Sequence, residues 1–211
     1  MNRLKIAVTK GRLLDNSIKM FKKSGLDTQP LENPGRRLIH EIPNYGLDVV
    51  MAKAPDVITY VEHGACDMGI VGKDTILESG RKFYEVLDLG FGKCRFSLAV
   101  RKGSDFFGTY KTRTIATKYP AVAAAYFASK GMDVTIIKIE GSVELAPILG
   151  LADAIVDIVE TGSTLAANGL EPIETICQIS ARLIVNTASM KVYKSEILDF
   201  INKCENALSQ G

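Results

Sequence analysis

The feature that most constrains this chain is a regular alternation of short apolar runs with segments of helical periodicity, which continues along all 211 residues. Residues 4–9 and 154–159 are apolar runs of strand length, whereas residues 13–23 repeat their apolar side chains at helical spacing. Strands that alternate with helices are typical of α/β proteins with largely parallel sheets. We therefore expect an α/β fold.

The same pattern predicts the order of the elements and a division into two lobes. Strands are expected at 4–9, 38–42, 47–52, 67–71, 83–89, 95–100, 114–117, 134–139, 154–159, 173–180 and 182–187. Helices are expected at 13–23, 56–62, 73–79, 121–130 and 192–208, with a short helix after Ser142. We place lobe I at 1–93 plus 182–211 and lobe II at 94–181, with the polar segment 102–111 as the connection into lobe II. Ligands of such folds bind at the carboxyl ends of strands, so a central cleft is the expected site.

Charge and hydropathy exclude several classes of function. The 26 Lys and Arg residues against 24 Asp and Glu residues leave a net charge of +2, too small for a protein that binds nucleic acid as its main partner. The apolar run after Lys5 is shorter than a signal-peptide core, and no stretch approaches the roughly 20 apolar residues that cross a bilayer. We expect a cytoplasmic protein with no membrane partner.

Cysteine and histidine are too few and too scattered for several kinds of site. The four cysteines lie tens of residues apart without a C-x-x-C pair, which argues against a zinc site and against a disulfide framework. Only His40 and His63 could serve as the base of a serine or cysteine hydrolase, and His63 lies where we expect a helix to end. No protein nucleophile is expected.

The most informative segment joins an apolar strand to a helix through hydroxyl residues. Residues 154–159 end in Glu160, Thr161, Gly162, Ser163 and Thr164, so backbone N–H groups and three hydroxyls converge at a helix start, which suits a phosphate group. Asp157 and Glu160 are placed to accept hydrogen bonds from sugar hydroxyls. The pattern resembles the phosphoribosyl-diphosphate (PRPP) loop of phosphoribosyltransferases. A simple N-capped helix is the alternative interpretation.

A second loop could complete an anion-binding floor. Gly141 and Ser142 stand at the mouth of the expected short helix, where backbone amides can meet an oxyanion. Glu140 and Glu144 flank them and are weaker candidates. A capping turn is the alternative, but the nearness of the segment 160–164 favours a common site.

The first lobe offers cations at two strand ends. Lys10, Gly11 and Arg12 follow the first strand, and this pattern suits a polyphosphate, because glycine lets the backbone approach and arginine can bind two oxygens. Gly72 and Lys73 follow a later strand. A solvated cationic turn is the alternative for Lys10–Arg12.

Taken together, these motifs resemble those of the ATP phosphoribosyltransferase family, whose members catalyse the first step of histidine biosynthesis. The resemblance rests on segments 9–13, 64–74, 141–144 and 152–170, which span nearly the whole chain in the family's order. It implies a two-lobed fold similar to the type II periplasmic binding proteins, with ATP and PRPP in the cleft. Lys53 is a departure, since the family often has an arginine there, and lysine cannot make a bidentate contact.

The resemblance also implies chemistry and partners. N1 of the adenine of ATP would displace diphosphate from the ribose C1 atom, with Mg²⁺ on the diphosphate. Long-form members of the family carry an additional C-terminal regulatory domain. This sequence ends after one expected helix and so resembles the short form, which works in homo- and hetero-oligomers with a regulatory subunit similar to histidyl-tRNA synthetase. A two-lobed sensing domain without catalysis is one alternative. A nucleobase phosphoribosyltransferase is another, disfavoured because Ile158 stands where those enzymes have a second acid.

Overall fold

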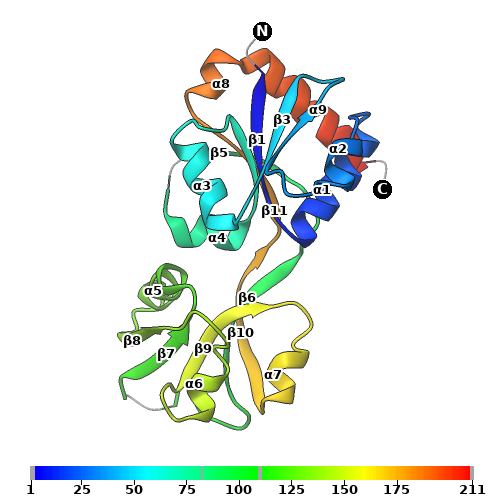
Figure 1. The fold of residues 1–211 in the computed structure, drawn as a ribbon. Coiled ribbons are helices and arrows are strands. Elements are labelled where there is room, and N and C mark those ends of the chain that lie inside the picture. Colours follow the sequence, from blue (N-terminus) through cyan, green and yellow to red (C-terminus); the bar gives the residue numbers. More distant parts are fainter. Residues whose placement is uncertain (1–2, 82, 109–110, 210–211) are drawn as a thin grey trace. The chain divides into compact units, whose positions relative to one another are not determined.

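The computed structural model describes residues 3–81, 83–108 and 111–209, and it divides the chain into two compact units (Figure 1). The first unit consists of Met1–Gly92 and Ser180–Gly211, and the second of Lys93–Ile179. The chain therefore passes from one unit to the other twice. The passages expected from the sequence, at 93/94 and 181/182, are one and two residues later along the chain.

The first unit is built on a six-stranded sheet in the order β2-β3-β1-β4-β11-β5. Its strands are β1 (Leu4–Thr9), β2 (Ile39–Ile42), β3 (Leu47–Ala52), β4 (Met68–Gly72), β5 (Tyr84–Asp88) and β11 (Ala181–Val185). β1 pairs in parallel with both β3 and β4, whereas β2 and β11 pair antiparallel with their neighbours. The carboxyl ends of β1, β3 and β4 consequently lie at one edge of this sheet.

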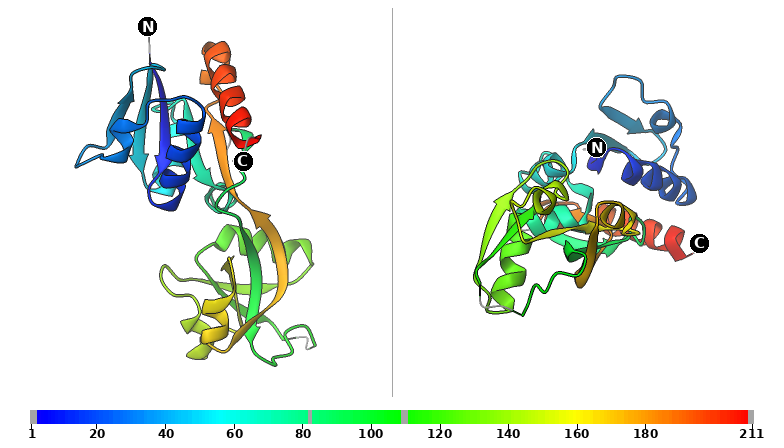
Figure 2. Two further views of the ribbon diagram at one scale, coloured as in Figure 1. Left: turned by 90° about the vertical axis from the view of Figure 1, so that its right-hand side faces the viewer. Right: turned by 90° about the horizontal axis from the view of Figure 1, so that it is seen from below.

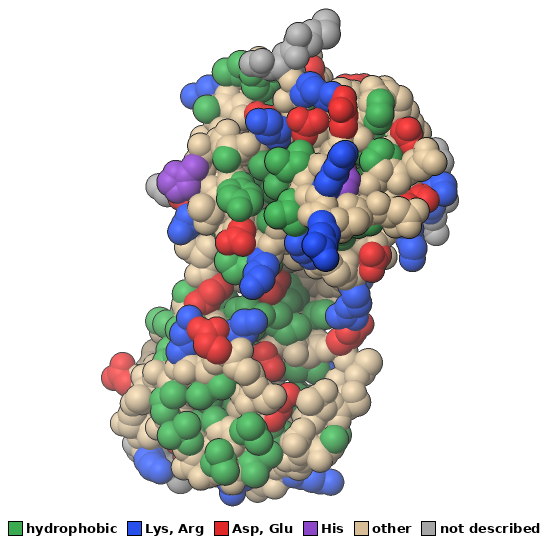
Figure 3. All heavy atoms as spheres, in the orientation of Figure 1, with side chains coloured by type: hydrophobic (Ala, Val, Ile, Leu, Met, Phe, Trp, Pro, Cys, Tyr) green, Lys and Arg blue, Asp and Glu red, His purple; other side chains and the backbone are tan. Residues whose placement is uncertain are grey.

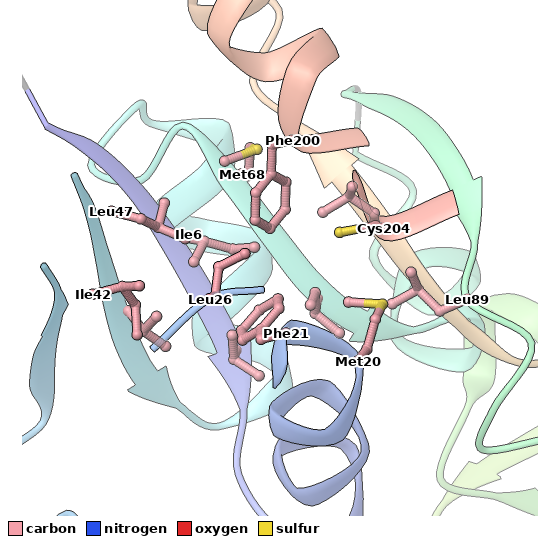
Figure 4. Close-up of a cluster of buried hydrophobic side chains, with 14 of the residues drawn as sticks. Ile6, Met20, Phe21, Leu26, Ile42, Leu47, Met68, Leu89, Phe200 and Cys204 are labelled. Carbon is pink, nitrogen blue, oxygen red and sulfur yellow. The ribbon is translucent and has the colours of Figure 1, made fainter. Parts of the chain in front are cut away.

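Helices cover both faces of this first sheet. They are α1 (Arg12–Lys23), α2 (Gln29–Glu32), α3 (Ala54–Glu62), α4 (Lys73–Ser79), α8 (Ser189–Val192) and α9 (Lys194–Ser209). On one face α1 and α9 lie side by side (Figures 1 and 2), where the Phe21 and Phe200 rings are 5.9 Å apart in a closed apolar core (Figure 4). On the other face Val57 and Val61 of α3 pack on β1 and β4. Burial on both faces explains why β1 and β4 are nearly uninterrupted apolar runs.

The second unit has a five-stranded sheet in the order β10-β6-β9-β7-β8. Its strands are β6 (Cys94–Arg101), β7 (Arg113–Thr117), β8 (Val134–Lys138), β9 (Ala154–Val159) and β10 (Leu170–Ile179). α5 (Pro120–Ser129) packs on one face through Phe127, next to Phe96 and Ile115. α6 (Leu145–Ile148) and α7 (Ser163–Ala167) cover the other face, where Leu165 meets Ile155.

The expected mixture of strands and helices is confirmed, but two details were wrong. The sheets are mixed rather than largely parallel. The segments that join the units form antiparallel pairs, β5 with β11 in the first sheet and β6 with β10 in the second. The polar segment 102–111 lies inside the second unit. It does not connect the units, because β6 has already brought the chain into the second sheet before Lys102.

The surface is mixed in character. Lys and Arg side chains alternate with Asp and Glu side chains over the face shown in Figure 3, in keeping with the net charge of +2. Hydrophobic side chains gather on the part of this face that belongs to the second unit. The exposed hydrophobic residues in and next to α6 are Leu145, Ile148 and Leu149. Within the part of the chain that the structure describes, every helix is too short or too polar to cross a membrane.

Gly69 of β4 is expected to be essential for the packing of α3. A Cβ atom there would lie 2.8 Å from methyl carbons of both Val57 and Val61, too close for a core that is already filled. We predict that Gly69→Ala lowers the free energy of unfolding by about 1–3 kcal/mol. Gly141→Ala is the matched control, because a Cβ atom there would meet nothing within 4 Å. Equal melting temperatures for the two variants would contradict this packing.

Candidate functional site

The second unit gathers three strand ends at one edge. β7 pairs in parallel with β8 and with β9, so Thr117, Lys138 and Val159 all end their strands on the same side. The loops that follow these strands contain residues 139–144 and 160–164. The structure therefore brings Gly141, Ser142 and the segment 160–164 to the same edge of one sheet.

The segment 160–164 comprises the tight turn after β9 and the first two residues of α7. Gly162 adopts φ 84° and ψ 1°, a left-handed conformation that glycine takes without strain. The Thr161 and Ser163 hydroxyl oxygens are 3.0 Å apart, and the Ser163 N–H donates to Thr161 Oγ1 at 3.3 Å. Thr161, Ser163 and Thr164 are exposed, so their hydroxyls are accessible to a ligand.

The capping alternative describes only part of this turn. Gly162, at the N-cap of α7, makes no side-chain hydrogen bond, and the Thr161 hydroxyl accepts the first N–H of the helix at 3.3 Å. The Asn168 amide closes the other end of the short helix by donating to the Thr164 carbonyl at 2.9 Å. The turn thus keeps its hydroxyl groups on the surface.

Asp157 lies behind this turn in a partly buried position on β9. The pKa of its carboxyl group is raised to about 6, mainly by burial and also by the nearby negative charge of Glu144. The Ile158 N–H and the positive charge of Lys118 act in the opposite direction. A carboxyl group with a pKa near neutrality inside a functional candidate region is a common feature of binding and catalytic sites.

Two basic residues near this turn were not identified from the sequence. Lys118 directly follows β7, and its charge acts on Asp157. The Arg95 guanidinium donates to the Glu160 carbonyl at 3.4 Å, which ties β6 to the turn. Lys118 could have been found from its place after an expected strand, as Lys10 was. Arg95 gave no such signal, because only the antiparallel pairing of β6 with β9 brings it here.

The first unit gathers its own set of predicted residues at the carboxyl edge of its sheet. Lys10, Gly11 and Arg12 follow β1, and Lys10 and Arg12 are exposed. Gly11 has φ 84° and precedes α1, whose first turn therefore begins beside two cations. Lys53 directly follows the neighbouring strand β3 and is exposed as well. Three cations thus lie along this edge.

Gly72 and Lys73 lie at the same edge but are engaged within the fold. A Cβ atom at Gly72 would meet the Asp74 carboxylate, so a larger residue there would require the Asp74 side chain to move. The Lys73 ammonium pairs with the Glu85 carboxylate, and the backbone N–H of Lys73 donates to the Ser180 carbonyl at 2.9 Å. Lys73 is consequently a weaker candidate for a polyphosphate than Lys10 or Arg12.

Within residues 3–81, 83–108 and 111–209, no group of three His, Cys, Asp or Glu side chains could hold a metal ion. Mg²⁺ commonly binds through only one or two carboxylates, together with water and the phosphates of a substrate. The residues present therefore fit a metal ion that is bound mainly by oxygen atoms of a substrate.

Comparisons with known proteins agree with this architecture. The family model HisG, described as ATP phosphoribosyltransferase, matches residues 53–206. An ATP phosphoribosyltransferase of Clostridium kluyveri is 59% identical over 208 residues, covering 99% of this chain and 95% of that protein. One from Clostridium botulinum is 55% identical over 212 residues, covering 100% of both chains.

Solved structures give the same picture. The ATP phosphoribosyl transferase (HisG:HisZ) complex from Thermotoga maritima matches with a TM-score of 0.84 and 34% identity, covering 99% of this chain and 100% of that one. The periplasmic aliphatic sulphonate binding protein SsuA from Escherichia coli matches with a TM-score of 0.60, covering 99% of this chain and 73% of that one. At 12% identity this second likeness concerns the fold alone, and it confirms the expected similarity to periplasmic binding proteins.

The family model covers most of the chain, and the relatives align over nearly all of it. The chain therefore belongs to the ATP phosphoribosyltransferase family and is a phosphoribosyl-transferring enzyme of the first step of histidine biosynthesis.

Proposed function

We propose that this chain transfers the 5-phosphoribosyl group of PRPP to N1 of the adenine of ATP, and that the carboxyl edge of the second unit binds PRPP. The observation that carries this assignment is the turn after β9, where accessible hydroxyls and a left-handed glycine lie next to the partly buried Asp157. A neutral turn rich in N–H and O–H donors suits a phosphate monoester, and an adjacent carboxylate suits sugar hydroxyls.

Each residue of this edge has a proposed role. Thr161, Gly162, Ser163 and Thr164 bind the 5-phosphate, whereas Asp157 and Glu160 accept hydrogen bonds from the ribose hydroxyls. Gly141 and Ser142 form a neighbouring part of the binding surface, where backbone N–H groups donate to phosphate oxygens. Their position in the loop after β8, at the same edge of the sheet as the turn after β9, supports this role.

The polyphosphate of ATP is assigned to the cationic edge of the first unit. Lys10 and Arg12 supply positive charge, and Gly11 allows the backbone to approach a phosphate. Gly72 and Lys73 complete the set, with Lys73 mainly holding the edge in place through Glu85.

The proposed chemistry requires no protein nucleophile. The adenine N1 lone pair forms a bond to the ribose C1 atom while the bond from C1 to the diphosphate oxygen breaks, which inverts the configuration at C1. The protein orients both substrates and stabilises the charge on the departing diphosphate. Mg²⁺, bound through the diphosphate, would supply part of this charge neutralisation.

We further propose that the enzyme works as a hetero-oligomer with a regulatory subunit similar to histidyl-tRNA synthetase, which brings sensitivity to histidine. The support is that this chain covers 100% of a chain of the HisG:HisZ complex, so the catalytic units alone account for the likeness. Regulation would then come from a second protein whose binding favours one state of the catalytic chain.

Thr164→Ala should weaken PRPP binding without affecting the fold. The Thr164 side chain is exposed, so its removal costs the structure little, whereas a hydrogen bond to a charged phosphate is worth about 1.5–3 kcal/mol. We predict that the KM for PRPP rises about tenfold or more. Thr135→Ala, an exposed threonine on β8, is the control. An unchanged KM in a folded Thr164→Ala protein would refute the phosphate assignment.

Arg12→Ala should impair ATP binding. Arg12 is exposed, so its loss is expected to change the free energy of unfolding by less than about 1 kcal/mol. Loss of a guanidinium contact to phosphate should lower kcat/KM for ATP by about tenfold or more. Lys19→Ala removes an exposed cation from the middle of the same helix and serves as the control. Kinetics that match this control would show that Arg12 does not contact the polyphosphate.

The affinity for PRPP should depend on the ionisation of Asp157. Because its pKa is raised to about 6, the carboxylate that accepts ribose hydroxyls forms only as the pH rises through that value. We predict that the KM for PRPP falls across this range and that Asp157→Asn removes the inflection. Ionisation of the substrate's own phosphate would persist in the variant, so the difference between the two pH profiles isolates Asp157.

Stability gives an independent check of the same group. The folded state holds the Asp157 proton more tightly than the unfolded chain, whose carboxyl pKa is 3.8. The contribution of Asp157 to stability therefore declines as the pH rises from 3.8 to about 6, and Asp157→Asn should abolish that decline. Parallel stability curves for the two proteins would contradict the burial of this carboxyl group.

A further inference from the structure

Ser97 of β6 has a hydroxyl group that the fold buries and does not use. Its neighbours Phe96 and Leu98 point into the apolar cluster under α5, so Ser97 faces the opposite side of the sheet, with Ala99. Ser97 is 0% exposed. Among the described residues, its Oγ atom has no hydrogen-bond partner.

This orphan hydroxyl is unusual because buried polar groups are nearly always hydrogen-bonded. Three of the other four such atoms in the part of the chain that the structure describes are guanidinium nitrogens of groups that also form ion pairs, as Arg182 does with Asp88 at 2.9 Å through another nitrogen. The fourth is the Tyr126 hydroxyl, which faces the Glu174 carboxylate. Alanine would fill the position of Ser97 at no polar cost, as Ala99 does on the same face. The hydroxyl therefore has no structural reason to be present.

The sheet register shows what the hydroxyl can reach. β6 runs between β9 and β10 (Figure 1), and Ser97 lies directly opposite Asp157 on one side and Thr175 on the other. Directly opposed residues of antiparallel strands have Cβ atoms about 4.5–5.5 Å apart and share one face. A small rotation of either side chain would bring the Ser97 hydroxyl within hydrogen-bond distance of the Asp157 carboxylate.

We propose that Ser97 is a positioning residue of the phosphoribosyl site, whose hydroxyl donates a hydrogen bond to the Asp157 carboxylate when PRPP is bound and so holds that carboxylate toward the ribose hydroxyls. The inference rests on the role proposed above for Asp157. Ser97 itself lies inside the sheet with no exposed surface, so it acts on the substrate through Asp157.

The groups around Asp157 are consistent with this role. Glu144, before α6, repels the ionised carboxylate, while Lys118, after β7, attracts it. At the same edge, Arg95 of β6 donates to the backbone of Glu160 rather than to a carboxylate. Burial outweighs these charges and keeps the carboxyl group partly protonated near pH 6. A donor on the neighbouring strand would favour the ionised form without placing a second charge in the sheet.

The test measures the KM for PRPP, and kcat at saturating PRPP against pH, in the wild type, Ser97→Ala and Ser97→Cys, because the pH profile of kcat reports the groups of the substrate complex. Loss of a donor to a charged group should raise the KM for PRPP by about tenfold and move the inflection upward by about one pH unit in Ser97→Ala. The thiol is a weaker donor of similar size, so Ser97→Cys should show an intermediate shift. The melting temperature of Ser97→Ala should be unchanged or higher, because an unsatisfied buried hydroxyl is removed.

Thr175→Val is the matched control. Thr175 is exposed and lies opposite Ser97 on β10, so the variant removes a hydroxyl on the side away from Asp157. It should leave the pH profile unchanged. A wild-type profile in Ser97→Ala, or an equal shift in Thr175→Val, would overturn the positioning role while leaving that of Asp157 intact. An inflection that survives in Asp157→Asn would instead refute the proposed function of Asp157 itself, and this inference with it.

Discussion

The parallel pairing of β7 with β8 and β9 is the constraint on which the proposed site depends. Parallel strands end on the same side, so three chain segments that are distant in sequence must emerge together at one edge. Hydrophobic burial holds this arrangement, because Ile155 and Ala116 of the central strands are completely or almost completely enclosed beneath α6 and α7. That core therefore fixes the positions of the turn with Gly162 and the loop with Gly141.

The two units provide contrasting environments for anions. The edge of the first sheet carries Lys10, Arg12 and Lys53, which suit a highly charged polyphosphate. The edge of the second sheet carries hydroxyls, backbone N–H groups and carboxylates, which suit a phosphorylated sugar. In this account the buried Asp157 marks the sugar end of the site, and its raised pKa is the consequence of being held in the sheet rather than in solvent.

Much of this arrangement could be predicted from the sequence, because its signals are local. The run from Ala154 to Val159 and the glycine and hydroxyl residues after it identified both β9 and its turn. What the sequence did not reveal depends on non-local pairing. The antiparallel register of β6 brings Ser97 and Arg95 beside β9, and the ion pair with Glu85 occupies Lys73. The polar segment after Lys102 resembled a linker because turn residues have the same composition inside a domain as between domains.

The most direct test of the central assignment is a crystal structure of the chain with PRPP and Mg²⁺. We predict that the 5-phosphate lies within hydrogen-bond distance of the Thr161, Ser163 and Thr164 hydroxyls, and that the ribose hydroxyls donate to the Asp157 carboxylate. Electron density for the 5-phosphate over Lys10 and Arg12, with the turn after β9 making no contact to the ligand, would contradict it.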